Sequence, residues 1–140
     1  MYYVNREQIA QRLRSVPDVA EAFRTLASEW NGTLLQGLAQ ERALHLAIEI
    51  VTDVGSCLID GFIMRDASSY EDIVEITGGE GVFPEALKET LLALVRLRRP
   101  LVQDYYEWPR ETLHPLAAKL SGALPAFKEA VESYLERELA

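Results

Sequence analysis

The sequence predicts an all-α protein, a bundle of four or five antiparallel helices in one domain that spans residues 1–140. Apolar residues recur every three or four positions along most of the chain, as on one face of a helix. Strand-like alternation never extends beyond a few residues. A length of 140 residues suits a single hydrophobic core. We find no internal repeat and no flexible linker, so we expect one domain.

The first apolar stripe predicts a helix that follows Asn5. Asn5 is a favourable N-cap, and Gln8 three residues later completes a capping-box pattern. Pro17 interrupts the stripe, so we expect a kink or a break near Ser15-Val16. Asn31-Gly32 is expected to end the helix. The stripe consists of Ile9, Leu13, Val16, Val19 or Ala20, Phe23, Leu26 and Trp30.

The second apolar stripe predicts a long helix that Thr33 caps and that extends to about Met64. Gly55 within it costs about 1 kcal/mol relative to alanine, so close packing against a neighbouring helix is a plausible reason for it. The expected buried stripe is Leu35, Leu38, the stem of Arg42, Leu46, Ile50, Val54, Cys57 or Leu58, and Phe62.

Two further helices are expected in the middle of the chain. Ser69 caps a short one, which Gly78-Gly79 ends. Phe83-Pro84-Glu85 opens the next, with proline in the first turn and an acidic residue where the helix dipole favours it. Pro100 lies inside this helix and should kink it.

The last helix is expected to begin at Trp108-Pro109. Pro115 and Pro125 suggest bends or a break within it. His114 would then lie in its first turn, where we expect a structural or exposed role.

Composition excludes several classes of function. The net charge of −8 opposes non-specific nucleic-acid binding, although a local basic patch can exist on an acidic protein. No apolar run reaches the roughly 18 residues of a membrane span, and the start of the chain lacks the pattern of a signal peptide. The lone Cys57 suits a reducing cytoplasm. With two histidines and one cysteine far apart, we expect no metal site and no cofactor.

The densest basic stretch is RLRRPLVQDYYEW, residues 96–108. A kink at Pro100 could bring Arg98, Gln103 and Tyr105 together as a phosphate-binding cluster, because a guanidinium offers a bidentate fork and tyrosine a hydroxyl. The alternative is structural: arginines near a helix C-terminus complement the helix dipole, and tyrosines cover the end of the bundle.

Polar residues also recur on the second helix. His45 and Glu49 have a metal-ligand spacing, but a third ligand would have to come from another helix, and a solvated face explains them as well. Asp53 could reach an arginine on a facing helix. Such a pair would orient the guanidinium if it were buried, or else form a surface ion pair worth under about 1 kcal/mol.

Four stretches together carry a family resemblance: MYYVNREQIAQRL, ERALHLAIEIVTDVGSCLI, SSYEDIVEITGGEGVFPEAL and RLRRPLVQDYYEW. In these stretches the chain resembles the HepT-like branch of the HEPN superfamily over essentially its whole length. The signature of that family is arginine, four residues, histidine, one residue, tyrosine. Arg98 and Tyr105 match it, Gln103 stands in place of the histidine, and Arg99 follows the signature arginine where a polar residue is common.

The resemblance implies a HEPN-type helical bundle that forms a two-fold homodimer. In active members the arginine and histidine cut RNA without a metal at the dimer cleft, and the partner is a nucleotidyltransferase antitoxin that in some systems adds AMP to the signature tyrosine. Gln103 cannot shuttle a proton, so we expect weakened or lost ribonuclease activity. Arg98 would remain at the catalytic position, Arg96 and Arg99 would bind phosphate, Asp53 and Asp104 would support them, and Tyr105 would be the modification candidate.

Three functions stay open at this point. The first is a toxin-type ribonuclease homologue that binds RNA or a nucleotide with little or no cleavage. The second is a non-enzymatic dimer that binds a protein such as a nucleotidyltransferase. The third is a nuclease that uses Glu49, Asp53 or Asp104 as its base. A metal-independent endoribonuclease is therefore only one of the alternatives.

Overall fold

The prediction of an all-α protein is confirmed. The computed structural model describes residues 2–140, and this part of the chain contains six α-helices and no strand. These are α1 (Arg6–Leu13), α2 (Val16–Glu29), α3 (Leu34–Gly61), α4 (Tyr70–Gly79), α5 (Glu85–Val95) and α6 (Leu116–Leu139). A π-helix (Arg99–Gln103) and a 3₁₀ turn (Tyr105–Glu107) lie between α5 and α6.

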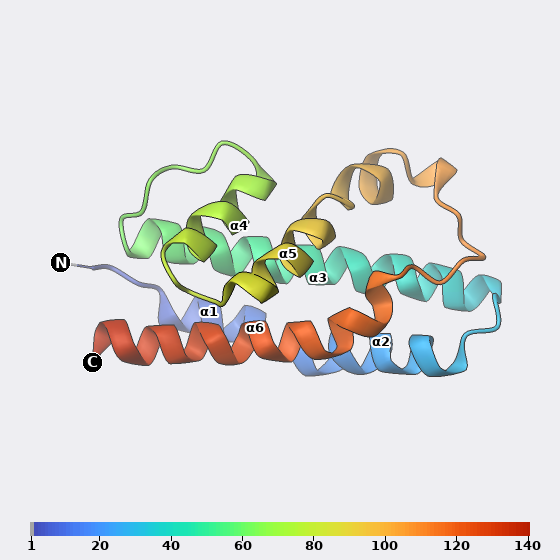
Figure 1. Cartoon of the computed structure of the whole chain (residues 1–140), viewed down its shortest axis with the longest axis horizontal. Coiled ribbons are helices and arrows are strands. Elements are labelled where there is room, and N and C mark those ends of the chain that lie inside the picture. The colour runs from blue at the N-terminus through green and yellow to red at the C-terminus, as the bar shows by residue number, and fades with distance from the viewer. Residues whose placement is uncertain (1) are drawn as a thin grey trace.

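The helices form an elongated antiparallel bundle around α3 (Figure 1). α2 and α6 run in opposite directions along one side of α3, while α4 and α5 cover another side. Both ends of the chain lie at the same end of the bundle. None of the helices in residues 2–140 is long and apolar enough to cross a membrane.

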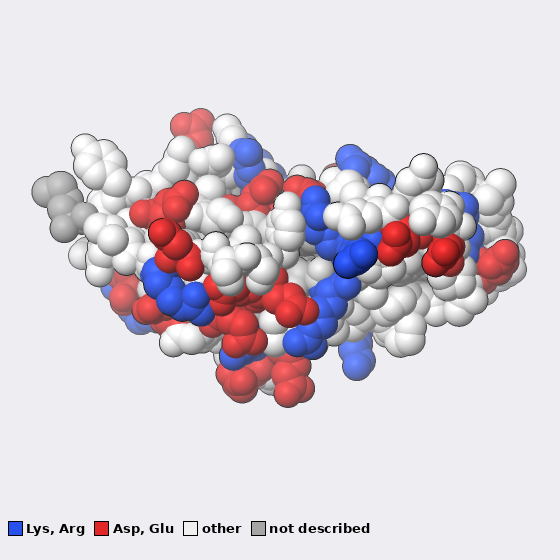
Figure 2. All heavy atoms as spheres, turned by 90° about the horizontal axis from the view of Figure 1, so that it is seen from above, with Lys and Arg blue, Asp and Glu red and all other residues white. Residues whose placement is uncertain are grey.

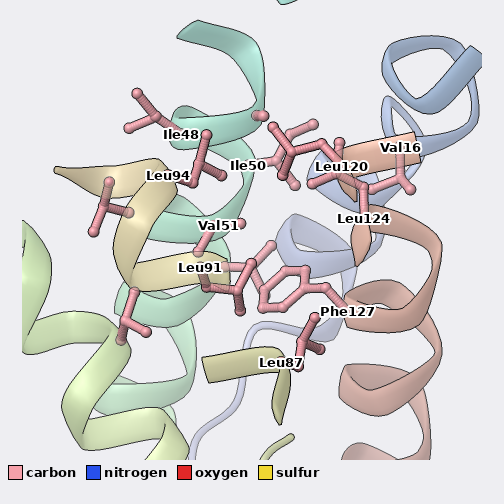
Figure 3. Packing of buried hydrophobic residues seen from close by; sticks show 14 of the residues in the cluster. Val16, Ile48, Ile50, Val51, Leu87, Leu91, Leu94, Leu120, Leu124 and Phe127 are labelled. Carbon is pink, nitrogen blue, oxygen red and sulfur yellow. The ribbon is translucent and has the colours of Figure 1, made fainter. Parts of the chain in front are cut away.

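One large hydrophobic cluster draws residues from all six helices. Figure 3 shows its middle, where Ile50 of α3 lies toward Leu120 of α6 and Leu91 of α5 lies toward Phe127 of α6. Phe127 is 2% exposed and Leu91 is fully buried, so both side chains contribute apolar burial to the core between α5 and α6.

Three of the predicted helix starts, at Asn5, Thr33 and Ser69, are confirmed by their caps. Oδ1 of Asn5 accepts a hydrogen bond from the backbone N of Gln8 at 3.0 Å, and Oγ of Ser69 accepts one from the backbone N of Asp72 at 3.0 Å. Thr33 and Gln36 form a complete capping box. The expected break near Ser15-Val16 is also present, because α1 ends at Leu13 and α2 begins at Val16.

The predicted start of the last helix is wrong. α6 begins at Leu116, and the preceding segment from Trp108 to Pro115 is irregular. This segment crosses the first turns of α3, where the buried amide of Gln40 donates to the carbonyl O of Thr112 at 3.1 Å and accepts from the backbone N of His114 at 2.7 Å. Side-chain bonds of this kind satisfy backbone groups that a helix would otherwise pair internally.

The same contact corrects the predicted stripe of α3. Leu35 and Leu38 were expected in the core, but they are 78% and 46% exposed. Gly37 and Gln40 are buried instead, because the irregular segment packs on their side of the helix. A Cβ on Gly37 would collide with the carbonyl O of Arg110, so this close approach needs glycine.

Gly55 is the contact point between α3 and α4, as its cost within a helix suggested. A Cβ at this position would collide with the side chain of Ile73. We expect Gly55→Ala to lower the free energy of unfolding by about 1–3 kcal/mol through overpacking, measured by urea denaturation. Gly122→Ala on α6 is the control: nothing lies within 4 Å of its added Cβ, so the variant should gain about 0.5–1 kcal/mol. Equal stabilisation by both changes would contradict the close packing.

Candidate functional site

The signature segment is not a continuation of α5. That helix ends at Val95, and a short turn leads into the π-helix Arg99–Gln103. Pro100 has no N–H to donate and its ring crowds the preceding turn, which favours a wider turn. The wide turn is closed by the backbone N of Asp104, which donates to the carbonyl O of Arg99 at 3.0 Å. Arg98 is consequently half-buried while Tyr105 is 56% exposed, so the two do not share one helix face.

Arg98 contacts an aromatic ring rather than a carboxylate. Its guanidinium carbon lies 4.3 Å from the centroid of the Tyr70 ring, at the start of α4. Its Nε is buried and makes no hydrogen bond to any residue in the described range 2–140. No ion pair to Arg98 is formed within this range, so its positive charge is not neutralised by a neighbouring carboxylate.

The two arginines beside Arg98 differ from it. Nε of Arg96 lies 2.6 Å from Oε1 of Glu71, which makes a close ion pair. Nε of Arg99 lies 3.9 Å from Oδ2 of Asp104, and the Arg99 side chain is 81% exposed. Arg99 is thus free to meet a phosphate, whereas Arg96 would first have to leave Glu71.

Gln103 and the tyrosines lie on the surface. Gln103 is exposed, and its side chain makes no hydrogen bond within the described chain. Tyr105 and Tyr106 are 56% and 70% exposed, and their rings meet edge to face with centroids 5.7 Å apart. Asp104 is half-buried between them and the π-helix. Gln103 and Tyr105 are therefore each accessible to a ligand or a partner.

Asp53 does contact an arginine of a facing helix, but not the signature arginine. Its Oδ2 lies 3.8 Å from Nε of Arg12 in α1. Burial, followed by the charge of Glu49, raises the pKa of Asp53, and Arg12 opposes that rise. Asp53 was expected to support the phosphate-binding arginine, but within the described residues it pairs with Arg12 and makes no ion pair with Arg98.

As a candidate metal ligand, His45 is paired with Glu49 in the structure, without a third ligand in the described residues. Nε2 of His45 lies 3.3 Å from Oε1 of Glu49. No group of three histidine, cysteine or carboxylate side chains in residues 2–140 is arranged to hold a metal ion. His45 instead lines a shallow groove of about 360 Å³ with Leu38, Val102 and Tyr105.

A cavity of about 450 Å³ on the other side of the π-helix was not predicted. Pro100 and Asp104 form one wall, and Trp108 and His114 form another. The His114 and Trp108 rings are nearly parallel, with centroids 5.9 Å apart. Nδ1 of His114 accepts from the backbone N of Leu116 at 3.0 Å, and burial lowers the pKa of His114. His114 therefore lies before α6 with its Nδ1 engaged as a hydrogen-bond acceptor, a placement that no sequence pattern indicated.

The fold is a helical bundle, and in residues 2–140 Arg98, which matches the signature arginine, has no carboxylate partner. The model of the family described as ribonuclease HepT-like matches residues 9–133, and the chain belongs to this family. Its resemblance to HepT-like proteins is thereby confirmed.

Two comparisons identify a particular relative. The chain is 37% identical over 139 residues to the Bacillus subtilis (strain 168) protein named "Putative RNase YutE", covering 99% of this chain and 95% of that one. It is also similar to a solved structure of YutE, described as a cytosolic protein of unknown function from Bacillus subtilis, with a TM-score of 0.86 and 35% identity. That match covers 99% of this chain and 96% of the other.

Proposed function

We propose that this protein binds RNA through Arg98 at a cleft between two copies of the chain, and that it cuts RNA much more slowly than a relative with histidine at the signature position. The observation that carries the proposal is the contrast between Arg98 and Gln103. Arg98 has a guanidinium with no carboxylate partner in the described chain, and the Gln103 amide has no acid–base group that titrates near neutral pH.

The chemistry explains why the two residues have different consequences. Attack by a 2′-hydroxyl on the adjacent phosphate needs a group that accepts a proton and one that donates it, and imidazole titrates near neutral pH. An amide can only form hydrogen bonds, so its presence costs about 10²–10⁴-fold in rate. Arg98 would still bind the phosphate and stabilise the charge that develops on it.

The test is the cleavage and binding of single-stranded RNA by purified wild-type protein with a chelator present. We expect salt-sensitive binding and cleavage close to that of a buffer control. Rapid cleavage that resists the chelator would show that another group moves the proton. The absence of any binding, even at low salt, would overturn the proposal. The cytoplasm is the compartment we propose, since the relative is described as cytosolic and Cys57 is unpaired.

The dimer in this proposal is supported by an exposed apolar surface beside the signature. Leu34 and Leu35 are 69% and 78% exposed at the start of α3. Leu38 lies in the same groove as Tyr105 and Val102. An apolar surface next to the signature residues suits a second copy of the chain, because a two-fold axis there would bring the two Gln103 faces together.

We predict a dimer at micromolar concentration, measured by sedimentation velocity. Leu38→Glu should shift the protein toward monomer, because it places a charge in an apolar contact. Tyr3→Glu is the control, since Tyr3 is 89% exposed at the opposite end of the bundle. A wild-type monomer, or an unchanged dimer in Leu38→Glu, would contradict this surface as the interface.

A second candidate function is supported by the exposure of Tyr105. The protein would then be a non-enzymatic dimer that binds a nucleotidyltransferase antitoxin. That enzyme would transfer AMP from ATP to Tyr105: the phenolic oxygen bonds to the α-phosphorus, pyrophosphate leaves and the hydroxyl proton is released. A side chain that is 56% exposed can enter the active site of another enzyme. The intact mass of the protein from its native cells, compared with that of Tyr105→Phe, tests this candidate. An added mass that Tyr105→Phe lacks would favour it, and identical masses apart from the substitution would count against it.

A further inference from the structure

The first turn of α4 contacts three arginines from two parts of the chain: Arg65 before the helix, and Arg96 and Arg98 after α5. Its first three residues are Tyr70, Glu71 and Asp72, directly after the N-cap Ser69. Tyr70 contacts Arg98 and Glu71 contacts Arg96.

The third arginine, Arg65, makes the most hydrogen bonds to this turn of α4. Nη1 and Nη2 of Arg65 donate to the two carboxylate oxygens of Asp72 at 2.8 and 2.7 Å. The same carboxylate accepts from the backbone N and the hydroxyl of Ser68. The hydrogen bonds from Arg65, and then those from Ser68, hold the pKa of Asp72 well below its usual range, because they stabilise the ionised carboxylate.

Tyr70, Glu71 and Asp72 make different kinds of contact with their arginines. Asp72 accepts hydrogen bonds from two nitrogens of Arg65, and Glu71 accepts one from Nε of Arg96, so each of these guanidinium groups has a carboxylate partner. Tyr70 carries no charge and contacts Arg98 over its ring face. An arginine that stacks on the face of a neutral ring is not neutralised, and its outer N–H groups can still donate hydrogen bonds to an anion. Figure 2, which views the molecule from above, shows basic side chains forming a band across this face with acidic side chains on both sides of it.

We infer that Tyr70 is a positioning residue for Arg98: its ring fixes the guanidinium toward a phosphate group of RNA while leaving the charge free. This inference rests on the proposed function and adds a residue to it. Two observations support this role for Tyr70: the guanidinium carbon lies 4.3 Å from the ring centroid, and Arg98 has no carboxylate partner in the described chain. Burial of Nε without a partner fits an arginine oriented for a ligand rather than for a bond within the protein.

The experiment is a double-mutant cycle on RNA affinity. Fluorescently labelled single-stranded RNA is titrated with wild-type protein, Tyr70→Leu, Arg98→Ala and the double variant. We expect Tyr70→Leu to weaken binding about 3- to 30-fold, as loss of a cation–π contact would. Adding Tyr70→Leu to Arg98→Ala should change affinity by less than about twofold, because the ring then has no cation to hold.

Two matched variants separate positioning from structure. Tyr70→Phe keeps the ring and should bind RNA as wild type does. Glu71→Gln changes the neighbouring residue of the same turn and frees Arg96, so it should bind RNA at least as tightly as wild type. The slope of log affinity against log salt adds a readout that folding does not move: Arg98→Ala should reduce it by about 0.7, the value for one contact to a single strand. Tyr70→Leu should reduce it in the same direction, and Tyr70→Phe should not.

The outcomes distinguish the inference from the function on which it rests. If Arg98→Ala leaves RNA affinity unchanged, the proposed function fails. If Arg98→Ala weakens binding and Tyr70→Leu does not, the function stands and the positioning role is overturned. Equal losses from Tyr70→Leu with and without Arg98 would also overturn it. Tyr70 is 42% exposed, so circular dichroism should show every Tyr70 variant folded.

Discussion

Replacing Gln103 by histidine is expected to raise RNA cleavage about 10²–10⁴-fold, because an imidazole would supply the missing proton acceptor and donor. Gln103 is exposed and its side chain makes no hydrogen bond within residues 2–140, so the change should disturb nothing around it. The measurement is the rate of cleavage of a single-stranded RNA in the presence of a chelator. The rate should rise between about pH 5 and 8, where an exposed imidazole loses its proton.

Two control variants test whether the gain comes from the imidazole. Gln103→Asn has a similar amide and should stay at the wild-type rate. Gln103→His combined with Arg98→Ala should lose the gain, because the phosphate is no longer held. A rate for Gln103→His no higher than that of a buffer control would remove the lost histidine as the explanation for weak activity, and the partner-binding candidate would gain. Fast cleavage by the wild-type protein would also contradict the proposal, because it would show that a histidine at position 103 is not needed.

Arg98→Ala is expected to weaken RNA binding about 10- to 100-fold, which corresponds to the loss of one charge-assisted contact with phosphate of about 1.5–3 kcal/mol. The variant should remain folded. Removing the side chain loses its contact with Tyr70 but also removes a buried Nε that has no partner in the described chain. These two effects oppose each other, so we expect the free energy of unfolding to change by less than about 1 kcal/mol.

The neighbouring arginine provides the comparison. Arg99→Ala should weaken binding less than Arg98→Ala, because the Arg99 side chain is 81% exposed and has not lost its hydration. Arg24→Ala, on the exposed side of α2 in a pair with Glu21, should have no effect. If all three changes weaken binding equally, RNA is held by overall charge rather than at Arg98.

Much of the helical framework could be predicted from the sequence because its signals are local. Asn5, Thr33 and Ser69 each cap the helix that follows them, and each bond spans only three residues. The break before Pro17 and the stop at Gly79 likewise depend on backbone chemistry within one turn.

The segment from Arg96 to Pro115 could not be predicted in the same way. Apolar spacing suggested one kinked helix followed by another, and Pro100 pointed to the kink. The actual course depends on Gln40, more than 70 residues away, whose amide bonds the backbone of Thr112 and His114. A buried glutamine looks like any surface glutamine in a sequence, because its partners are backbone groups with no side-chain signature.

The sequence by itself determined the all-α class, the helix starts, the family resemblance and the presence of glutamine where that family has histidine. Only the tertiary structure decided which polar residues meet. It paired Asp53 with Arg12, Arg96 with Glu71 and Arg98 with Tyr70, and it exposed Leu35 and Leu38. The physical reason is that a cap forms within one turn of the chain, whereas the partner of a charge is fixed by the packing of helices that are distant in sequence.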